Sequence, residues 1–308
     1  MRNVAAGNPD FHILLGDDFS VDTMRAPTQP FVAALYAYQR QFLAQIGRPV
    51  FLVNGNHEQA ARYVLDGTSD NVAVWGQNAR NLFLPQPAPD GFYTGDTEQV
   101  PHIGLLRDYA AFTWGDALFV TIDPYWHSDT AVDNQLGSRD KGTDPWAATL
   151  GDAQYAWLEK TLESSRAKYK FVFAHHVLGT GRGGIEEATR FEWGGRNQDG
   201  SWGFDTARPD WEKPIQQLMA DNDVTIFFQG HDHVYAKQAL DGVVYQTAPS
   251  PADPNEALLN ADAFRSGLVL PGSGHLRVTV SPAGVKVDYV KTSLGADNGR
   301  IITGYSIP

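Results

Sequence analysis

The sequence contains no cysteine among its 308 residues. That absence excludes disulfide bonds, thiolate zinc sites and cysteine nucleophiles. No apolar run approaches the roughly 18 residues that span a membrane, and the opening residues, MRNVAAGNPD, lack the apolar core of a secretory signal. We therefore expect no membrane partner, while a secreted or periplasmic location stays open.

Basic residues are also few. The chain has 24 Lys and Arg against 36 Asp and Glu, which gives a formal net charge of −12. A protein that wraps nucleic acid neutralises phosphates with Lys and Arg, so this balance argues against such a partner. Positive charge for an anionic ligand would have to come from a local source such as bound metal ions.

Hydrophobic residues make up 42% of the chain, enough for a substantial core. Short apolar runs alternate with segments of helical spacing, such as 30–46, where Phe31, Leu35, Tyr38 and Phe42 recur at helical intervals. The predicted strands are 11–15, 49–53, 117–122, 171–174 and 224–228, and the predicted helices are 30–46, 152–167 and 214–220. Continuous apolar strands between helices predict an α/β fold with a covered sheet.

The pattern changes after Gly230, where strands follow one another without helices. They are predicted at 234–238, 243–246, 275–280 and 285–290, with Asp241-Gly242 as a hairpin signal. We expect these strands to form a second, more antiparallel sheet packed on the first, within a single domain covering 1–308. Two stretches rich in Gly, Pro, Trp and Asp, 68–116 and 179–211, are predicted to be long loops that wall a site.

Four short polar motifs each follow an apolar strand. They are Gly16-Asp17, Gly55-Asn56-His57-Glu58, His175-His176 and Gly230-His231-Asp232-His233. Ligands gather at the carboxyl ends of the strands in an α/β sheet, so we expect these motifs to converge. Carboxylate, amide oxygen and imidazole are suitable ligands for hard or borderline cations. Each motif alone is also compatible with a turn, but the ordered set predicts a metal site.

These motifs resemble those of the calcineurin-like metallophosphoesterase superfamily, which includes the purple acid phosphatases. The resemblance implies a two-sheet α/β/β/α sandwich and hydrolysis of phosphate monoesters or diesters by a metal-held hydroxide. It implies one or two divalent or trivalent ions per chain, with Mn, Fe and Zn as candidates, and a small phosphorylated substrate. The metal ligands that it implies are Asp17, Asn56, His175, His231 and His233.

Other roles are also implied by the resemblance. His57 would contact the phosphoryl or leaving group as the catalytic residue, and Glu58 would orient His57. Apart from the resemblance, His176 and Arg182 are candidates for substrate binding, although an arginine in the 179–184 loop is more typically a solvated surface residue. A homo-oligomer is compatible with the sequence and stays open.

The family's D-x-H motif is not where the resemblance requires it. Asp10-Phe11-His12 has that spelling, but Asp10 and Asp17 are on the order of 23 Å apart in an extended strand, whereas paired metals lie about 3.5–4 Å apart. We therefore assign Asp17 as a ligand and interpret Asp10 and His12 as structural. The expectation is that the chain begins late relative to its family and lacks the first strand. Asp18 and Asp22 are candidate substitute ligands.

This incomplete first-metal shell keeps a second hypothesis open. It is a non-catalytic or single-metal member of the family that binds a phosphoryl ligand or a metal without turnover.

Overall fold

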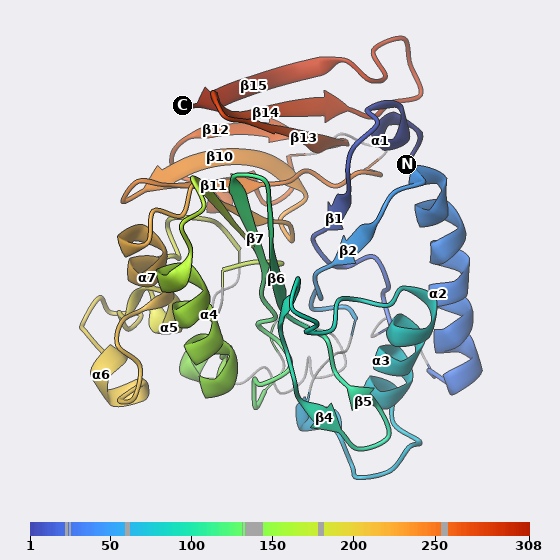
Figure 1. The fold of residues 1–308 in the computed structure, drawn as a ribbon, viewed down its shortest axis with the longest axis vertical. Helices are drawn as coiled ribbons and strands as arrows, with labels where there is room; N and C mark the ends of the chain where they lie inside the picture. Colours follow the sequence, from blue (N-terminus) through green and yellow to red (C-terminus); the bar gives the residue numbers. More distant parts are fainter. Residues whose placement is uncertain are drawn as a thin grey trace.

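The computed structural model describes residues 1–21, 24, 26–58, 62–130, 132, 144–177, 182–253 and 258–308. Its largest sheet has eight strands in the order β12-β10-β11-β9-β8-β7-β6-β3 (Figure 1). They are β3 (Thr94–Gly95), β6 (Ala110–Trp114), β7 (Ala117–Thr121), β8 (Tyr169–Phe173), β9 (Ile226–Gln229), β10 (Val234–Leu240), β11 (Val243–Thr247) and β12 (Leu268–Pro271). The central strands β7, β8, β9 and β11 pair in parallel, and antiparallel strands flank them.

The central strands are buried on both faces, as continuous apolar runs predict. Leu118, Val120 and Val172 point to a layer of helices, whereas Phe119 and Phe171 point to the opposite side. The covering helices are α4 (Asp152–Ser164), α5 (Phe191–Gly194), α6 (Phe204–Ala207) and α7 (Ile215–Asp221). Figure 1 shows them together on one side of the sheet.

A three-stranded antiparallel sheet packs on the other face of the large sheet. It consists of β13 (Gly274–Ser281), β14 (Gly284–Lys291) and β15 (Ile301–Ile307). Val285 and Val287 of β14 share a core with Phe171 and Phe228 of the large sheet. The fold is therefore a two-sheet α/β sandwich.

The amino-terminal part adds a small parallel sheet beside this sandwich. It contains β1 (His12–Leu14) and β2 (Val50–Leu52), preceded by helix α1 (Arg2–Ala6) and covered by α2 (Gln29–Leu43) and α3 (Val72–Phe83). Short 3-10 turns lie at Ala44–Ile46, Arg62–Val64, Pro145–Ala147 and Ala261–Ala263. Within the described residues, β1 pairs with β2 on one edge and with no strand on the other.

The sheet predicted after Gly230 needs a correction. Segments 234–238 and 243–246 do form strands and a hairpin, but β10 and β11 extend the large sheet, since β11 pairs in parallel with β9. The second sheet therefore holds β13, β14 and β15. The apolar pattern of a strand does not specify which strand it pairs with, because both sheets bury the same residue types.

The two predicted long loops also contain regular structure. Helix α3 begins at an Asn71 cap, whose side chain accepts from the Ala73 amide, and the hairpin of β4 (Gln99–Val100) and β5 (Gly104–Leu105) follows. The second stretch contains α5 and α6. These helices and strands are short or have polar faces, so their sequences do not show the apolar periodicity by which helices and strands are predicted.

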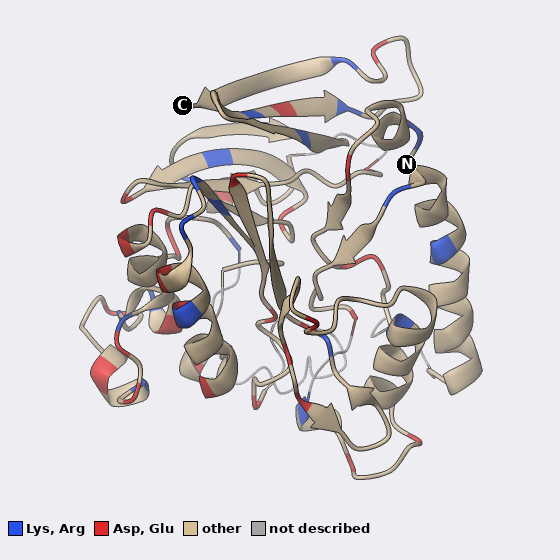
Figure 2. Ribbon diagram, in the orientation of Figure 1, with Lys and Arg blue, Asp and Glu red and all other residues tan. Residues whose placement is uncertain are grey.

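Helical spacing predicted α2, but not the face that it buries. Val32, Tyr36 and Leu43 are buried, and Tyr36 stacks on Phe19 with ring centroids 4.0 Å apart. Phe31 is 68% exposed and Tyr38 57% exposed. Figure 2 shows that charged residues are sparse on this helix, where Arg40 is the one charged side chain. None of the helices in the described ranges is long and apolar enough to cross a membrane.

Candidate metal centre

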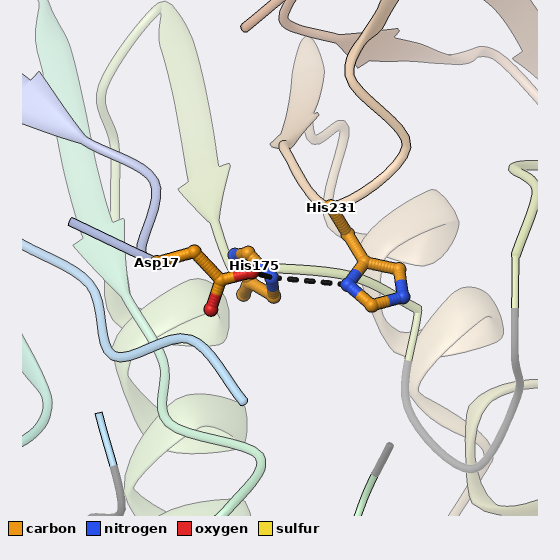
Figure 3. A group of neighbouring side chains, drawn as sticks. All are labelled: Asp17, His175 and His231. Carbon is orange, nitrogen blue, oxygen red and sulfur yellow. Dashed lines mark hydrogen bonds and ion pairs between the residues drawn. The ribbon is translucent and has the colours of Figure 1, made fainter. Parts of the chain in front are cut away.

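Side chains from four separate segments converge at the carboxyl ends of the strands. Asp17, His175 and His231 each offer a ligand atom within 4.8 Å of the others, and Figure 3 shows the three side chains pointing toward one another. The His175 Nε2 atom lies 3.0 Å from Asp17 Oδ2 and 3.1 Å from His231 Nδ1. Asn56 Oδ1 lies 3.1 Å from the same His231 nitrogen. The geometry thus brings together four of the predicted ligands.

The orientation of His175 is fixed by the backbone. Its Nδ1 atom lies 2.5 Å from the Leu15 carbonyl oxygen, so Nδ1 carries the proton and Nε2 faces the centre. Such a bond to the far ring nitrogen orients a metal-binding histidine. Burial lowers the pKa of His175, but the Asp17 carboxylate and the Leu15 carbonyl outweigh burial and raise the pKa above its usual value.

Asp17 is held as a carboxylate. Burial acts to raise its pKa, but the neighbouring His175 and His57 hold the pKa of the Asp17 carboxyl well below its usual range. Its Oδ1 atom accepts a hydrogen bond from the His57 amide at 3.0 Å, and its Oδ2 atom lies 3.9 Å from His57 Nε2. The Oδ1 atom of Asp17 therefore holds the loop that carries His57, and the Oδ2 atom faces His175 in the ligand group.

The loops that carry Asp17 and Asn56 touch backbone to backbone. A Cβ atom on Gly16 would lie 2.6 Å from the Gly55 nitrogen, and one on Gly55 would lie 2.2 Å from Asp17 Oδ1. Neither contact is sterically possible for a larger residue. The glycines of both motifs are thus required by close approach.

Glu58 joins the same two loops, a role that differs from the predicted one. Its buried carboxylate accepts hydrogen bonds from the amides of Asp17 and Phe19, both at 3.0 Å, and from the amide of Gly55. Burial and the nearby Asp17 raise the pKa of Glu58 to about 7. Glu58 is therefore a positioning residue for the metal-site backbone.

We expect Glu58→Ala to lower metal affinity by about 10- to 100-fold, the range typical of groups that orient ligands. The three released amides would let the Asp17 loop move relative to Gly55. Titration of metal-stripped protein with Mn²⁺ or Zn²⁺ by calorimetry measures the effect. Asp205→Ala, at an exposed position of α6 outside the ligand group, is the matched control. An unchanged dissociation constant in a folded Glu58→Ala protein would contradict this role.

Three site residues adopt left-handed backbone conformations. The φ angles are 62° for Asp17, 64° for His231 and 61° for His233. Such conformations are uncommon for residues other than glycine and are concentrated at functional sites. The turns that end β1 and β9 are therefore shaped by the site rather than by local preference.

His233 and Arg182 lie beside the ligand group rather than within it. His233 is exposed at its surface. The part of its ring that is buried lowers the pKa of His233, and the Asp17 charge opposes that effect. Arg182 donates to the His231 carbonyl at 3.0 Å and to Asp232 Oδ1 at 3.3 Å, and its side chain is 41% exposed. Arg182 is thus tied to the loop that carries both histidines.

His176 lies behind the ligands, where it is 1% exposed. Its ring packs edge to face on His231, with centroids 4.7 Å apart, and its Nδ1 atom lies 3.3 Å from the Tyr125 hydroxyl. This position favours support of His231 over the direct substrate contact that was predicted.

The alternative ligands lie elsewhere. His12 is at the opposite end of β1 from Asp17, and burial and the charge of His275 lower its pKa to about 4. Asp10 is exposed, Asp18 is half-buried near Glu58, and Asp22 lies outside the described residues.

Sequence reasoning missed two supporting aspartates. Asp123 is fully buried after β7 and accepts from the Asn54 side chain at 2.6 Å, at the base of the Asn56 loop. Asp232 accepts from Arg182 and from the Gly183 amide at 3.0 Å. A polar residue directly after a buried strand was the available signal in both cases.

The donor set fits a metal ion. Carboxylate oxygen, amide oxygen and two imidazole nitrogens suit borderline cations such as Zn²⁺, Fe and Mn²⁺. The tautomer of His175 and the ionised state of Asp17 both direct lone pairs to the same point.

Comparison with known proteins gives one family. The model of the calcineurin-like phosphoesterases matches residues 1–235. No curated protein gives a significant match. A purple acid phosphatase from yellow lupin (Lupinus luteus) seeds superposes with a TM-score of 0.53 at 16% identity, covering 99% of this chain and 48% of that one. A putative 5'-nucleotidase from Staphylococcus aureus gives a TM-score of 0.43 at 16% identity, with 92% and 51% covered. The chain thus spans about half the length of each structure.

Proposed function

This chain belongs to the calcineurin-like phosphoesterase family, and from this premise we propose that it is a metal-dependent hydrolase of small phosphate monoesters or diesters. The observation that carries the proposal is the convergence of Asp17, His175 and His231 within 4.8 Å, with Asn56 beside them. When bound, one or two ions would supply positive charge to the phosphoryl oxygens and activate the attacking water.

The residues of the chain have distinct roles in this proposal. Asp17, Asn56, His175 and His231 hold the ion, and His233 is the added candidate ligand if a second ion binds. His57, whose side chain is 26% exposed and lies next to Asp17, protonates the departing oxygen. Arg182, at the rim of the ligand group, contacts the phosphoryl oxygens.

The test is metal content per chain together with turnover of a chromogenic phosphate monoester and its diester after addition of Mn²⁺, Zn²⁺ or Fe²⁺. We expect one or two ions per chain and metal-dependent turnover of at least one ester. Bound metal without turnover of either ester, in a folded sample, would replace this proposal with a binding module. That alternative is favoured by the position of His233 outside the ligand group.

A further inference from the structure

A buried acidic cluster lies next to the metal centre. Asp96 and Asp108 are each 2% exposed and Asp123 is fully buried, and one buried guanidinium, Arg80, lies among them. Three buried carboxylates facing one cation would be unstable if all were ionised, because an unpaired buried charge is far costlier than a neutral group. At least one member of the cluster must therefore be neutralised.

Asp108 is the member of the cluster whose carboxyl group has no hydrogen bond among the described residues to offset its burial. No hydrogen-bond donor in the described structure reaches either of its carboxyl oxygens. Asp96, in contrast, accepts from the amides of Glu98 and Arg107 at 2.7 and 2.8 Å, and Asp123 accepts from Asn54 and from the Tyr125 amide. Asp96 lies against the same backbone segment as Asp108, because it accepts from the Arg107 amide and its own amide donates to the Tyr109 carbonyl at 3.1 Å. A hydrogen bond between the two carboxyls would need one of them to carry a proton.

The electrostatic surroundings agree with this geometry. Burial raises the pKa of Asp108 well above its usual value, the carboxylates of Asp123 and Asp96 raise it further, and Arg80 opposes them. The adjacent Tyr109 is affected by the same cluster, since burial and the charges of Asp96, Asp108 and Glu98 raise its pKa. Asp108 therefore keeps its proton to a higher pH than an exposed aspartate does.

The pair lies where the two ends of residues 96–107, which we call the strap, come together. Arg80 of α3 donates to the Arg107 carbonyl of the strap and to the Leu52 carbonyl at the end of β2. Leu106 and Val100 of the strap pack on Trp126, directly after the Asp123–Tyr125 turn. One side of the cluster thus supports the Asn56 loop, and the other supports Tyr125, which contacts His176.

We propose that Asp108 is a positioning residue that shares one proton with Asp96, and that this proton holds the two ends of the strap together so that the strap keeps its contacts with the two segments behind the metal centre. Because the folded chain binds this proton more tightly than the unfolded chain, its contribution to stability is lost as pH rises from the acidic range through the titration of Asp108. Alkaline pH should therefore loosen the strap and the segments that it supports.

The test compares Asp108→Asn, which keeps a donor toward Asp96 without the charge, with Asp108→Ala, which removes the donor. The free energy of unfolding is measured by urea denaturation at pH values from 5 to 9.5, together with hydrogen-exchange protection factors for the strap. Asp116→Asn, at an exposed turn between β6 and β7, is the matched control.

In the wild type, one bound proton makes the folding equilibrium constant change by about tenfold per pH unit across the titration. We expect Asp108→Asn to abolish this pH dependence of the free energy of unfolding. Its strap should stay protected at pH 9, where the wild-type strap exchanges faster. Asp108→Ala should lose strap protection at every pH. Equal destabilisation by both substitutions, with the wild-type pH slope retained, would overturn the shared proton.

Activity gives a second measurement that rests on the proposed function. The kcat/KM of the wild type for a chromogenic monoester should fall at alkaline pH, and Asp108→Asn should move that fall to higher pH. Identical profiles for the two proteins would overturn the link from the strap to the metal centre. Absence of turnover would count against the proposed function alone, since the stability and exchange measurements do not require activity.

Discussion

Asp17→Asn is expected to lower kcat/KM for a chromogenic phosphate monoester by about three orders of magnitude or more, because metal-ion stabilisation supplies several kcal/mol and each 1.4 kcal/mol is tenfold. The substitution preserves shape but removes the charge that faces His175 Nε2 at 3.0 Å. It also places an amide NH₂ group where carboxylate oxygens meet the His57 amide and His175. The measurements are metal content per chain and steady-state kinetics under saturating metal.

The control for this variant precedes strand β1, whereas Asp17 follows that strand. Asp10 is exposed at the other end of β1, so Asp10→Asn changes the same charge without touching the ligand group. It should retain wild-type metal content and turnover. If Asp17→Asn kept full metal content and activity, or if Asp10→Asn lost both, the assignment of Asp17 would be wrong and the D-x-H alternative would regain support.

His57→Ala is expected to lower kcat by about 10²- to 10⁴-fold, the range of general acid–base catalysis, while metal content stays unchanged. The His57 amide donates a hydrogen bond to Asp17, while its ring lies 3.9 Å from the other carboxylate oxygen, so loss of the imidazole leaves the loop attached. If His57 protonates the departing oxygen, the loss should be small for a nitrophenol and large for an alkyl alcohol, which needs the proton more. The measurement is kcat for a series of monoesters with leaving groups of different pKa.

His102→Ala is the matched control, since His102 is exposed on the strap and its ring bonds only to the Gly67 carbonyl among the contacts described for it. It should leave the whole series unchanged. A loss in His57→Ala that is equal for all leaving groups would assign His57 to phosphoryl binding instead of proton donation. A lower metal content in His57→Ala would indicate that His57 is a metal ligand.

Much of the fold was predictable because its strands are short apolar runs bounded by turn residues. The predicted segments 117–122, 171–174 and 224–228 correspond to β7, β8 and β9. Helix α3 was not predicted, because Gln77, Arg80 and Asn81 use its polar face to bind carbonyl groups of the strap and of β2, which disguises the apolar period. Pairing between distant strands depends on tertiary packing, which explains the misplacement of β10 and β11.

The candidate site was predictable in its centre and less so around it. The order of polar motifs after strands predicted that Asp17, Asn56, His175 and His231 would meet, since parallel strands end at one edge. The contacts of Glu58 and Asp123 depend on the direction of backbone N–H groups in turns, for which residue types give no signal. The burial of His176 likewise follows from which side of β8 it faces rather than from its place in the motif.

The parallel pairing of β7, β8, β9 and β11 has a consequence for how the protein is made. Asp17 follows β1 of the small sheet, whereas His175 and His231 follow β8 and β9 of the large sheet, so these ligands meet only after the two sheets have packed together. Chains dominated by such long-range pairings fold slowly, because loop closure precedes most of the stabilising contacts. A nascent chain released before β9 is synthesised would lack His231, so the metal centre is a product of the completed fold and cannot serve as its nucleus.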